Sequence, residues 1–301
     1  MSWKLSVIAP RVAIEDALAR QECDANWDES LVITGFEIAP DQPDVWQLDG
    51  YVEDRPSQAQ RNAIKALFDG PAPYIRAERL PDADWVTESQ RGMDPIRAGR
   101  FYVHTPDHPR SLEPGVRDFC IPAAQAFGTG QHATTAGCLT MLNTMKQRGV
   151  VARNLADIGT GTGLLAFAAL HLWPNARAVA SDIDPICLPA VEENAAINHV
   201  AMGIGPGQLE MVIAQGMEDH TLADRALYDL LIANILAAPL IDLAPDFAAA
   251  MAPRSHIVLS GLLTTQEAKV RAAYYRVGFR LQARLTQGDW AILWLRQRYL
   301  Y

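Results

Sequence analysis

The feature that most constrains this chain is a glycine loop that follows directly on a short apolar strand. Residues 154–158 form the expected strand, and glycines stand at 159, 161 and 163, just before the apolar helix expected over 164–173. Glycines permit a tight turn and let backbone N–H groups approach a ligand without obstruction by a Cβ atom. Leu164 stands where a dinucleotide-binding fingerprint has its third glycine, which argues against nicotinamide binding.

Strand-like and helix-like segments alternate from about residue 126 onward. The chain closes on two strands, 279–286 and 290–296, which flank a Gln-Gly-Asp turn and predict an antiparallel hairpin. Alternating strands and helices predict a doubly wound, mostly parallel sheet of seven strands, of the α/β class. The ligand of such a sheet lies at the carboxyl ends of the strands, where the glycine loop also stands.

The first eighty residues predict a separate, smaller domain. Their pattern of strand, helix, two strands, helix and strand is the ferredoxin-like α+β plan. Residues 81–105 lack sustained periodicity, apart from one strand expected at Phe101–His104, and we interpret them as a linker. The larger domain is then expected over residues 106–301. No internal repeat interrupts this organisation.

Charge is distributed unevenly between these regions. Residues 1–90 hold 8 Lys and Arg against 17 Asp and Glu, whereas residues 91–301 hold 18 of each. An acidic field confined to one domain can steer a basic partner toward it, or it can simply keep a small domain soluble. Both interpretations argue against nucleic acid as a direct ligand of this end.

Composition excludes several other classes of protein. The four cysteines stand far apart with no C-x-x-C spacing, so neither a disulfide framework nor a metal site is expected. No run of 18 uncharged apolar residues is present, and the first residues do not resemble a secretory leader. We therefore expect a cytoplasmic protein that does not enter a membrane.

An acidic side chain follows the next strand after the glycine loop. Asp182 stands 23 residues after Gly159, where a carboxylate can accept hydrogen bonds from both hydroxyls of a ribose. A carboxylate at a strand end can instead cap the following helix, and Asp184, just before Pro185, fits that capping role better. Asp182 is therefore the predicted ribose ligand.

A glycine loop with a ribose acid and no dinucleotide spacing resembles the S-adenosylmethionine-dependent methyltransferases. Asn234 stands two residues after the strand expected over 228–232, and it is followed by Ile-Leu-Ala. Methyltransferases that act on amino groups place Asn or Asp before Pro-Pro at this point, and this sequence resembles a variant of that pattern. A side-chain amide oxygen there can hold the N–H bonds of an amine so that its lone pair faces the methyl group. Alternatively, Asn234 satisfies only backbone groups.

Two further segments narrow the resemblance. Residues 126–135 read Ala-Phe-Gly-Thr-Gly-Gln-His-Ala-Thr-Thr, and residues 259–263 read Leu-Ser-Gly-Leu-Leu. Together with Asn234 to Leu240 they closely resemble the ribosomal protein L11 methyltransferase (PrmA) family over residues 80–301. The sequence departs from the family pattern at Gln131 and Ala133, on the substrate side. By this resemblance the cofactor is bound by Phe127, Gly128, Thr135, Gly159, Gly161, Asp182 and Asn234, of which Asn234 is also the catalytic residue.

The resemblance implies an S-adenosyl-L-methionine-dependent enzyme, a monomer, that methylates lysine ε-amino and N-terminal α-amino groups of a basic ribosomal protein. It also implies that the first domain recognises this substrate. His132 could act as a general base, but a loop histidine at a helix start more often bonds backbone. Three alternatives stay open: a methyltransferase of the same fold acting on another protein or a small amine, a non-catalytic ribosome-associated binding protein, and a dehydrogenase.

Overall fold

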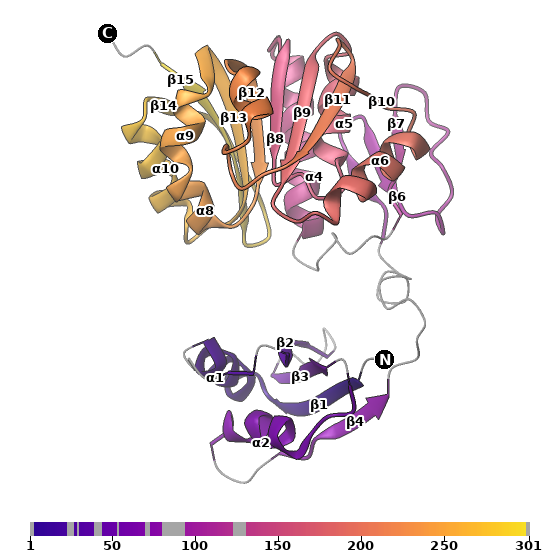
Figure 1. Ribbon diagram of the computed structural model, residues 1–301, viewed down its shortest axis with the longest axis vertical. Coiled ribbons are helices and arrows are strands. Elements are labelled where there is room, and N and C mark those ends of the chain that lie inside the picture. The colour runs from indigo at the N-terminus through magenta and orange to yellow at the C-terminus, as the bar shows by residue number, and fades with distance from the viewer. Residues whose placement is uncertain are drawn as a thin grey trace. The chain divides into compact units, whose positions relative to one another are not determined.

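The chain divides into two compact units, residues 1–88 and residues 89–301 (Figure 1). The computed structural model describes residues 3–22, 27–28, 30–38, 44–52, 54–69, 73–79, 94–122 and 131–298. Each unit has its own hydrophobic core: nine buried apolar side chains among the described residues of the first unit form one cluster, separate from the two clusters of the second.

The first unit is a four-stranded antiparallel sheet with two helices. Its strands are β1 (Trp3–Pro10), β2 (Val32–Glu37), β3 (Val45–Val52) and β4 (Arg76–Arg79). Its helices are α1 (Arg11–Glu22) and α2 (Gln58–Ala66). The strand order is β2-β3-β1-β4, and every neighbouring pair is antiparallel. This is the ferredoxin-like arrangement, so the prediction for this unit is confirmed.

Local sequence accounts for the ends and faces of these elements. Ser57 begins α2 with a capping box, in which its hydroxyl accepts the Gln60 backbone N–H and the Gln60 side chain accepts the Ser57 backbone N–H. Leu5 and Val7 alternate along β1 with more exposed neighbours and pack, fully buried, with Ile14 of α1. One face of the sheet is thereby buried under the helices.

The second unit is built on an eight-stranded sheet of order β10-β11-β9-β8-β12-β13-β15-β14. Its strands are β8 (Asn154–Ile158), β9 (Arg177–Asp182), β10 (Ala201–Met202), β11 (Gln208–Ile213), β12 (Tyr228–Asn234), β13 (Met251–Leu263), β14 (Phe279–Gln287) and β15 (Trp290–Gln297). The first six run parallel, and β14 and β15 form the expected antiparallel hairpin. The predicted seven strands are confirmed, and the two-residue β10 adds an eighth.

Helices cover both faces of this sheet. They are α4 (Gln131–Gln147), α5 (Leu164–Leu172), α6 (Cys187–Ile197), α7 (His220–Asp224), α8 (Ala237–Asp242), α9 (Ala244–Ala249) and α10 (Glu267–Arg276). Along β12, Leu230 and Ile232 join the core under α4 and α5, whereas Leu231 and Ala233 join the core under α8 and α10. Alternate residues therefore face opposite layers, as in a doubly wound fold. None of the helices described is long and apolar enough to span a membrane.

A second, three-stranded sheet corrects the predicted domain boundary. It consists of β5 (Ile96–Ala98), β6 (Phe101–His104) and β7 (Arg117–Cys120). Phe101 and Phe119 are fully buried in the same core as α4 and α5. Residues 96–104, which the sequence assigns to a linker, thus belong to the second unit. The strand predicted at Phe101–His104 is confirmed as β6.

Candidate active site at the carboxyl edge of the sheet

The sequence-predicted residues Gly159, Asp182 and Asn234 lie at one edge of the large sheet. They end or follow β8, β9 and β12, which are adjacent and parallel. Ile158 at the end of β8 pairs with Ser181 on one side and with Ala233 on the other. The three predicted residues are each one position further along their strands, so the structure brings them together.

Backbone hydrogen bonds fold the glycine loop against β9. The amides of Gly159 and Thr160 both donate to the carbonyl oxygen of Ser181, at 2.8 and 3.0 Å. Gly159, Gly161 and Gly163 have φ angles of +71°, +57° and +83°, which other residues rarely adopt. The loop therefore requires its glycines for conformation, and α5 begins directly after it.

Asp182 joins the glycine loop to the end of β9. Its Oδ2 atom accepts a hydrogen bond of 2.8 Å from the Gly161 amide, and its Oδ1 atom accepts one from the Asp184 amide. Two of the predicted cofactor residues are thus in direct contact. Asp184 accepts the Ile186 amide at 3.0 Å in the turn before α6, but the N-cap of the helix is Ile186 itself, which has no side-chain capping bond, so the capping role expected of Asp184 is wrong.

The Asp157 side chain holds the glycine loop and the start of α5 by hydrogen bonds, a role that the sequence analysis did not assign to it. Its Oδ2 atom accepts hydrogen bonds from the Thr160 hydroxyl (2.6 Å) and the Ala166 amide (3.1 Å). Burial raises the pKa of Asp157 to about 7, and the neighbouring Asp182 carboxylate adds to the rise. The sequence signal for this role was an acidic residue within a mostly apolar strand. The burial of Asp157 could not be derived from the strand alone.

Asn234 ends β12 with an acceptor that has no partner. Within the described part of the chain, its Oδ1 atom is buried and receives no hydrogen bond. The Asp157 Oδ1 and Ser181 Oγ atoms at the same edge are likewise buried and unpartnered. Buried polar groups are nearly always hydrogen-bonded in folded proteins. Three such groups on three adjacent strands mark this edge as a place where a polar ligand fits.

Gly261 holds the chain after Asn234 in place. It follows Ser260, which pairs with Asn234 in the parallel register of β12 and β13. Gly261 has a φ angle of +82°, and a Cβ atom there would stand 2.2 Å from the Ile235 carbonyl oxygen. Close backbone contact between β13 and Ile235 therefore depends on glycine. The sequence analysis named Gly261 only as part of the 259–263 segment and gave it no role of its own.

Thr135 lies in α4 and is 6% exposed. One turn later, burial raises the pKa of the Cys138 thiol to about 12, with the Asp157 carboxylate contributing. The early part of α4 thus lies near Ser260 of β13, which pairs with Asn234 at the same edge. Phe127 and Gly128 lie outside the described residues, and so does the side chain of His132. Among the residues described, no group of three or more His, Cys, Asp or Glu side chains could hold a metal ion.

The donors and charges at this edge fit a cationic nucleoside. Asp182 offers carboxylate oxygens at a strand end, the usual acceptor for ribose hydroxyls. Asp157 and Asp182 interact electrostatically, and a positively charged ligand group nearby would relieve the repulsion that disfavours the ionised form of Asp157. The φ angles of the loop let backbone approach the ligand closely. These features suit the sulfonium nucleoside S-adenosylmethionine better than a dinucleotide pyrophosphate, whose binding loop has a third glycine at the position of Leu164.

Comparison with solved structures gives the class of fold. A ribosomal protein L11 methylase from Lactobacillus delbrueckii subsp. bulgaricus superimposes with a TM-score of 0.56 at 26% identity, covering 69% of this chain and 100% of that one. The second unit thus has the class I methyltransferase fold.

Sequence comparison gives the family. The family model for ribosomal protein L11 methyltransferase (PrmA) matches residues 10–298. A ribosomal protein L11 methyltransferase from Rhizobium meliloti (strain 1021) is 37% identical over 270 residues, which are 89% of this chain and 90% of the relative. Another from Brucella suis (strain ATCC 23445 / NCTC 10510) is 39% identical over 269 residues, 89% of this chain and 90% of the relative. This chain belongs to the PrmA family, as its motifs suggested.

Proposed function

We propose that this protein transfers methyl groups from S-adenosyl-L-methionine to amino groups of ribosomal protein L11. The observation that carries the proposal is the grouping of the glycine loop, Asp182 and the unpartnered Asn234 amide oxygen at one edge of the sheet. Family membership supports the substrate, because the relatives are named for it.

The cofactor is held by groups from three neighbouring strands. Asp182 binds the ribose hydroxyls, and the glycine loop lies against the nucleoside with its backbone. By the resemblance to the family, Phe127, Gly128 and Thr135 complete the contacts. Bound S-adenosylmethionine supplies a methyl group that is attached to a positively charged sulfur. This sulfur is already an activated leaving group. The protein therefore needs to orient and desolvate the amine rather than to activate the methyl donor.

Asn234 is the proposed catalytic residue because its buried Oδ1 atom has no partner among the described residues and can accept a hydrogen bond from the substrate amine. Its Oδ1 atom accepts a hydrogen bond from an N–H group of the substrate amine, so the nitrogen lone pair points at the methyl carbon. A new C–N bond forms as the S–CH3 bond breaks, and its electron pair stays on sulfur. A lysine ammonium ordinarily has a pKa of about 10.4 and must first lose a proton, which can pass to solvent before docking. An α-amino group, with an ordinary pKa of about 7.7–8.0, loses its proton more readily.

The first unit is the proposed recognition module for the substrate. Its excess of acidic over basic residues complements a basic ribosomal protein and accelerates their encounter. Methylation at several separate amino groups further requires that the two units change their relative positions during the reaction cycle. We also propose that the protein acts as a cytoplasmic monomer that contacts neither nucleic acid nor a membrane directly.

Intact-mass spectrometry tests this function. Purified protein, S-adenosylmethionine and ribosomal protein L11 are mixed, and the expected result is a gain in steps of about 14 Da on the ribosomal protein, one for each methyl group that replaces a proton. Free lysine in place of L11 tests for a small-amine enzyme. The same reaction without S-adenosylmethionine is the control. Binding of S-adenosylmethionine without any mass gain would leave only the non-catalytic binding protein and would overturn the proposal.

A further inference from the structure

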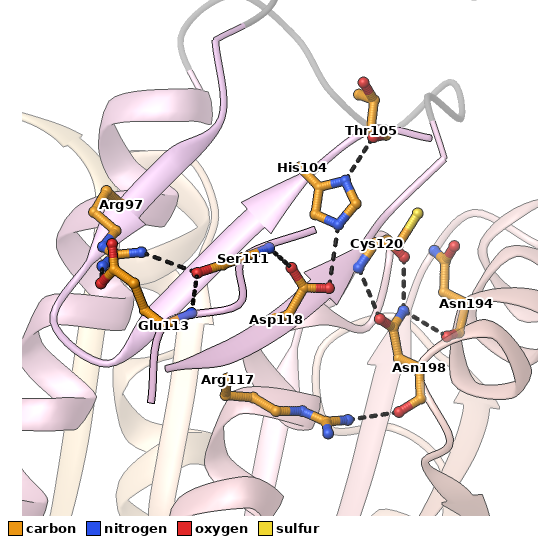
Figure 2. A network of polar contacts seen from close by, with 10 residues as sticks. All are labelled: Arg97, His104, Thr105, Ser111, Glu113, Arg117, Asp118, Cys120, Asn194 and Asn198. Atoms are coloured by element: carbon orange, nitrogen blue, oxygen red, sulfur yellow. Dashed lines mark hydrogen bonds and ion pairs between the residues drawn. The ribbon is translucent and has the colours of Figure 1, made fainter. Parts of the chain in front are cut away.

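Two buried asparagines, one in α6 and one at its C-cap, connect the glycine loop to the three-stranded sheet β5-β6-β7, called the small sheet below. Asn194 and Asn198 stand one helical turn apart and are 2% and 5% exposed. The Asn198 Nδ2 atom donates to the Asn194 backbone carbonyl at 2.8 Å. Neither side chain was selected by the sequence analysis, and neither belongs to the site described above. Figure 2 shows how both lie in one network of polar contacts.

The Asn194 side chain holds the middle of the glycine loop. Its Nδ2 atom donates a hydrogen bond of 3.0 Å to the Thr162 carbonyl oxygen, and both groups are buried. Thr162 stands between Gly161 and Gly163, which both have positive φ angles. Because glycine peptides rotate easily, a fixed carbonyl between them restricts the loop to one conformation.

The Asn198 side-chain amide forms hydrogen bonds with the backbone of β7, as the backbone of a neighbouring strand would. Its Oδ1 atom accepts the Cys120 amide at 2.8 Å, and its Nδ2 atom donates to the Cys120 carbonyl at 2.7 Å. Because β7 is an edge strand in the order β5-β6-β7, Asn198 satisfies backbone groups that a further strand would otherwise pair. Arg117 strengthens the junction, since its Nη2 atom donates to the Asn198 carbonyl at the end of α6.

We propose that Asn194 and Asn198 are positioning residues that fix the glycine loop relative to the carboxyl end of β7. The path of hydrogen bonds is continuous from Thr162 through Asn194 and Asn198 to Cys120. α6 itself starts five residues after Asp182, so the helix that contains Asn194 follows closely on the predicted ribose acid. The inference rests on the proposed function, because it assumes that the glycine loop binds the cofactor.

The matched control is Asn143, which is 8% exposed and accepts Arg100 Nε at 3.0 Å. It joins α4 to the turn between β5 and β6, so it also anchors the small sheet, but no hydrogen bond described here links it to the glycine loop. Asn143→Ala, Asn194→Ala and Asn198→Ala each remove buried hydrogen bonds and lower stability. Only the last two are expected to alter the geometry of the loop.

The experiment measures the Kd of S-adenosylhomocysteine by calorimetry and the free energy of unfolding by urea, for the full-length protein and each variant. Asn194→Ala and Asn198→Ala are expected to raise Kd about tenfold, and the double variant no more than the larger single one. Asn143→Ala should change Kd less than about twofold at a comparable loss of stability. Equal increases in all three variants, or none in the α6 variants, would overturn the inference.

A measurement on the wild-type protein covers the case in which a variant does not fold. Saturation with S-adenosylhomocysteine should slow hydrogen exchange of the Cys120 amide, which donates to Asn198, more than exchange of the Ile121 amide, which donates to His104 within the small sheet. Equal slowing would contradict the coupling. A wild-type protein that binds no S-adenosylhomocysteine would overturn the proposed function and this inference together, whereas normal wild-type binding with unchanged variants would overturn the inference alone.

Discussion

Among the residues that the structure describes, each unit buries one aspartate, and the two differ in their hydrogen-bond partners. In the first unit, Asp49 is 2% exposed and is satisfied by Gln47 at 2.9 Å, by Tyr51 at 3.4 Å and by Lys4 at 3.8 Å. In the second unit, Asp157 is 1% exposed and one of its oxygens has no partner among the described residues. The first unit thus completes the polar contacts of its buried aspartate, whereas the second leaves them incomplete at the edge where its predicted site residues meet.

The two buried aspartates therefore indicate different roles: that of the first unit stabilises the fold, and that of the second lies in the candidate active site. A buried charge whose partners are all in place contributes to a single well-defined structure. A buried acceptor without a partner lowers stability and is retained in natural proteins mainly at functional sites. We therefore expect substitutions at the edge of the second unit to change cofactor binding and transfer. Substitutions in the first unit should change only stability or substrate affinity.

The largest expected effect is that of an added methyl group at Gly261. Gly261→Ala brings a Cβ atom against the backbone of Ile235 at a φ angle of +82°, and we expect it to lower the free energy of unfolding by about 3 kcal/mol. Gly35→Ala in the first unit meets only the side chains of Ile14 and Leu18, which can shift, so its effect should be smaller. Urea unfolding of both variants compares them, and a larger loss for Gly35→Ala would contradict the account.

Removal of the Asn234 amide should affect transfer far more than binding. Asn234→Ala is expected to lower kcat about 100-fold, because the amine loses its orienting acceptor, while the Kd of S-adenosylhomocysteine changes less than about threefold. Asn62→Ala, at an exposed position of α2 in the first unit, should leave both unchanged. Steady-state methylation of L11 and calorimetry provide the two values. An unchanged kcat for Asn234→Ala would exclude the catalytic role.

Charge on the first unit should control affinity for the substrate. Neutralising the exposed Asp16, Asp44 and Asp54 to Asn is expected to raise the KM for L11 about fivefold at low salt and to weaken its salt dependence, with kcat unchanged.

The matched control for this charge effect neutralises three exposed aspartates of the second unit, Asp224, Asp246 and Asp289. It removes the same number of charges from a region whose charges already balance. Kinetics at two ionic strengths compare the two triple variants. Equal KM values would show that the acidity of the first unit serves solubility alone.

A separate expected effect is a pH dependence of stability caused by Asp157. The pKa of Asp157 is about 7 in the folded protein, against an ordinary value of 3.8. Between these values the unfolded chain has lost the proton that the folded protein keeps, so the free energy of unfolding decreases as pH rises from about 4 to about 7. Asp157→Asn should remove this contribution. Urea unfolding at pH 5 and pH 8 measures it, and an identical pH dependence in both proteins would contradict the assignment.

Much of the fold follows from sequence because its signals are local. Periodicity locates β8 at Asn154–Ile158, the same bounds that the structure shows, and the capping pattern at Ser57 locates the start of α2. The grouping of Gly159, Asp182 and Asn234 also follows, since parallel strands present their carboxyl ends at one edge. The order β2-β3-β1-β4 of the first unit follows from its βαββαβ pattern.

Other features depend on contacts between distant segments. β5 has only three residues, too few for a periodic pattern, and it is stabilised by burial of Ile96 against the core of the second unit. Asn198 resembles any polar residue at a helix end until Cys120, 78 positions earlier, is placed beside it. The raised pKa of Asp157 likewise arises from burial by the whole fold rather than from its neighbours in sequence.

The measurement that tests the central claim most directly is calorimetric titration of S-adenosylhomocysteine combined with hydrogen exchange. The account predicts binding of one equivalent, with slowed exchange at the amides of Gly159 and Gly161 and at the carboxyl ends of β9 and β12. No binding would contradict it. So would slowed exchange confined to α10 and β14, where Arg271, Arg276 and Arg280 line a groove of about 550 Å³.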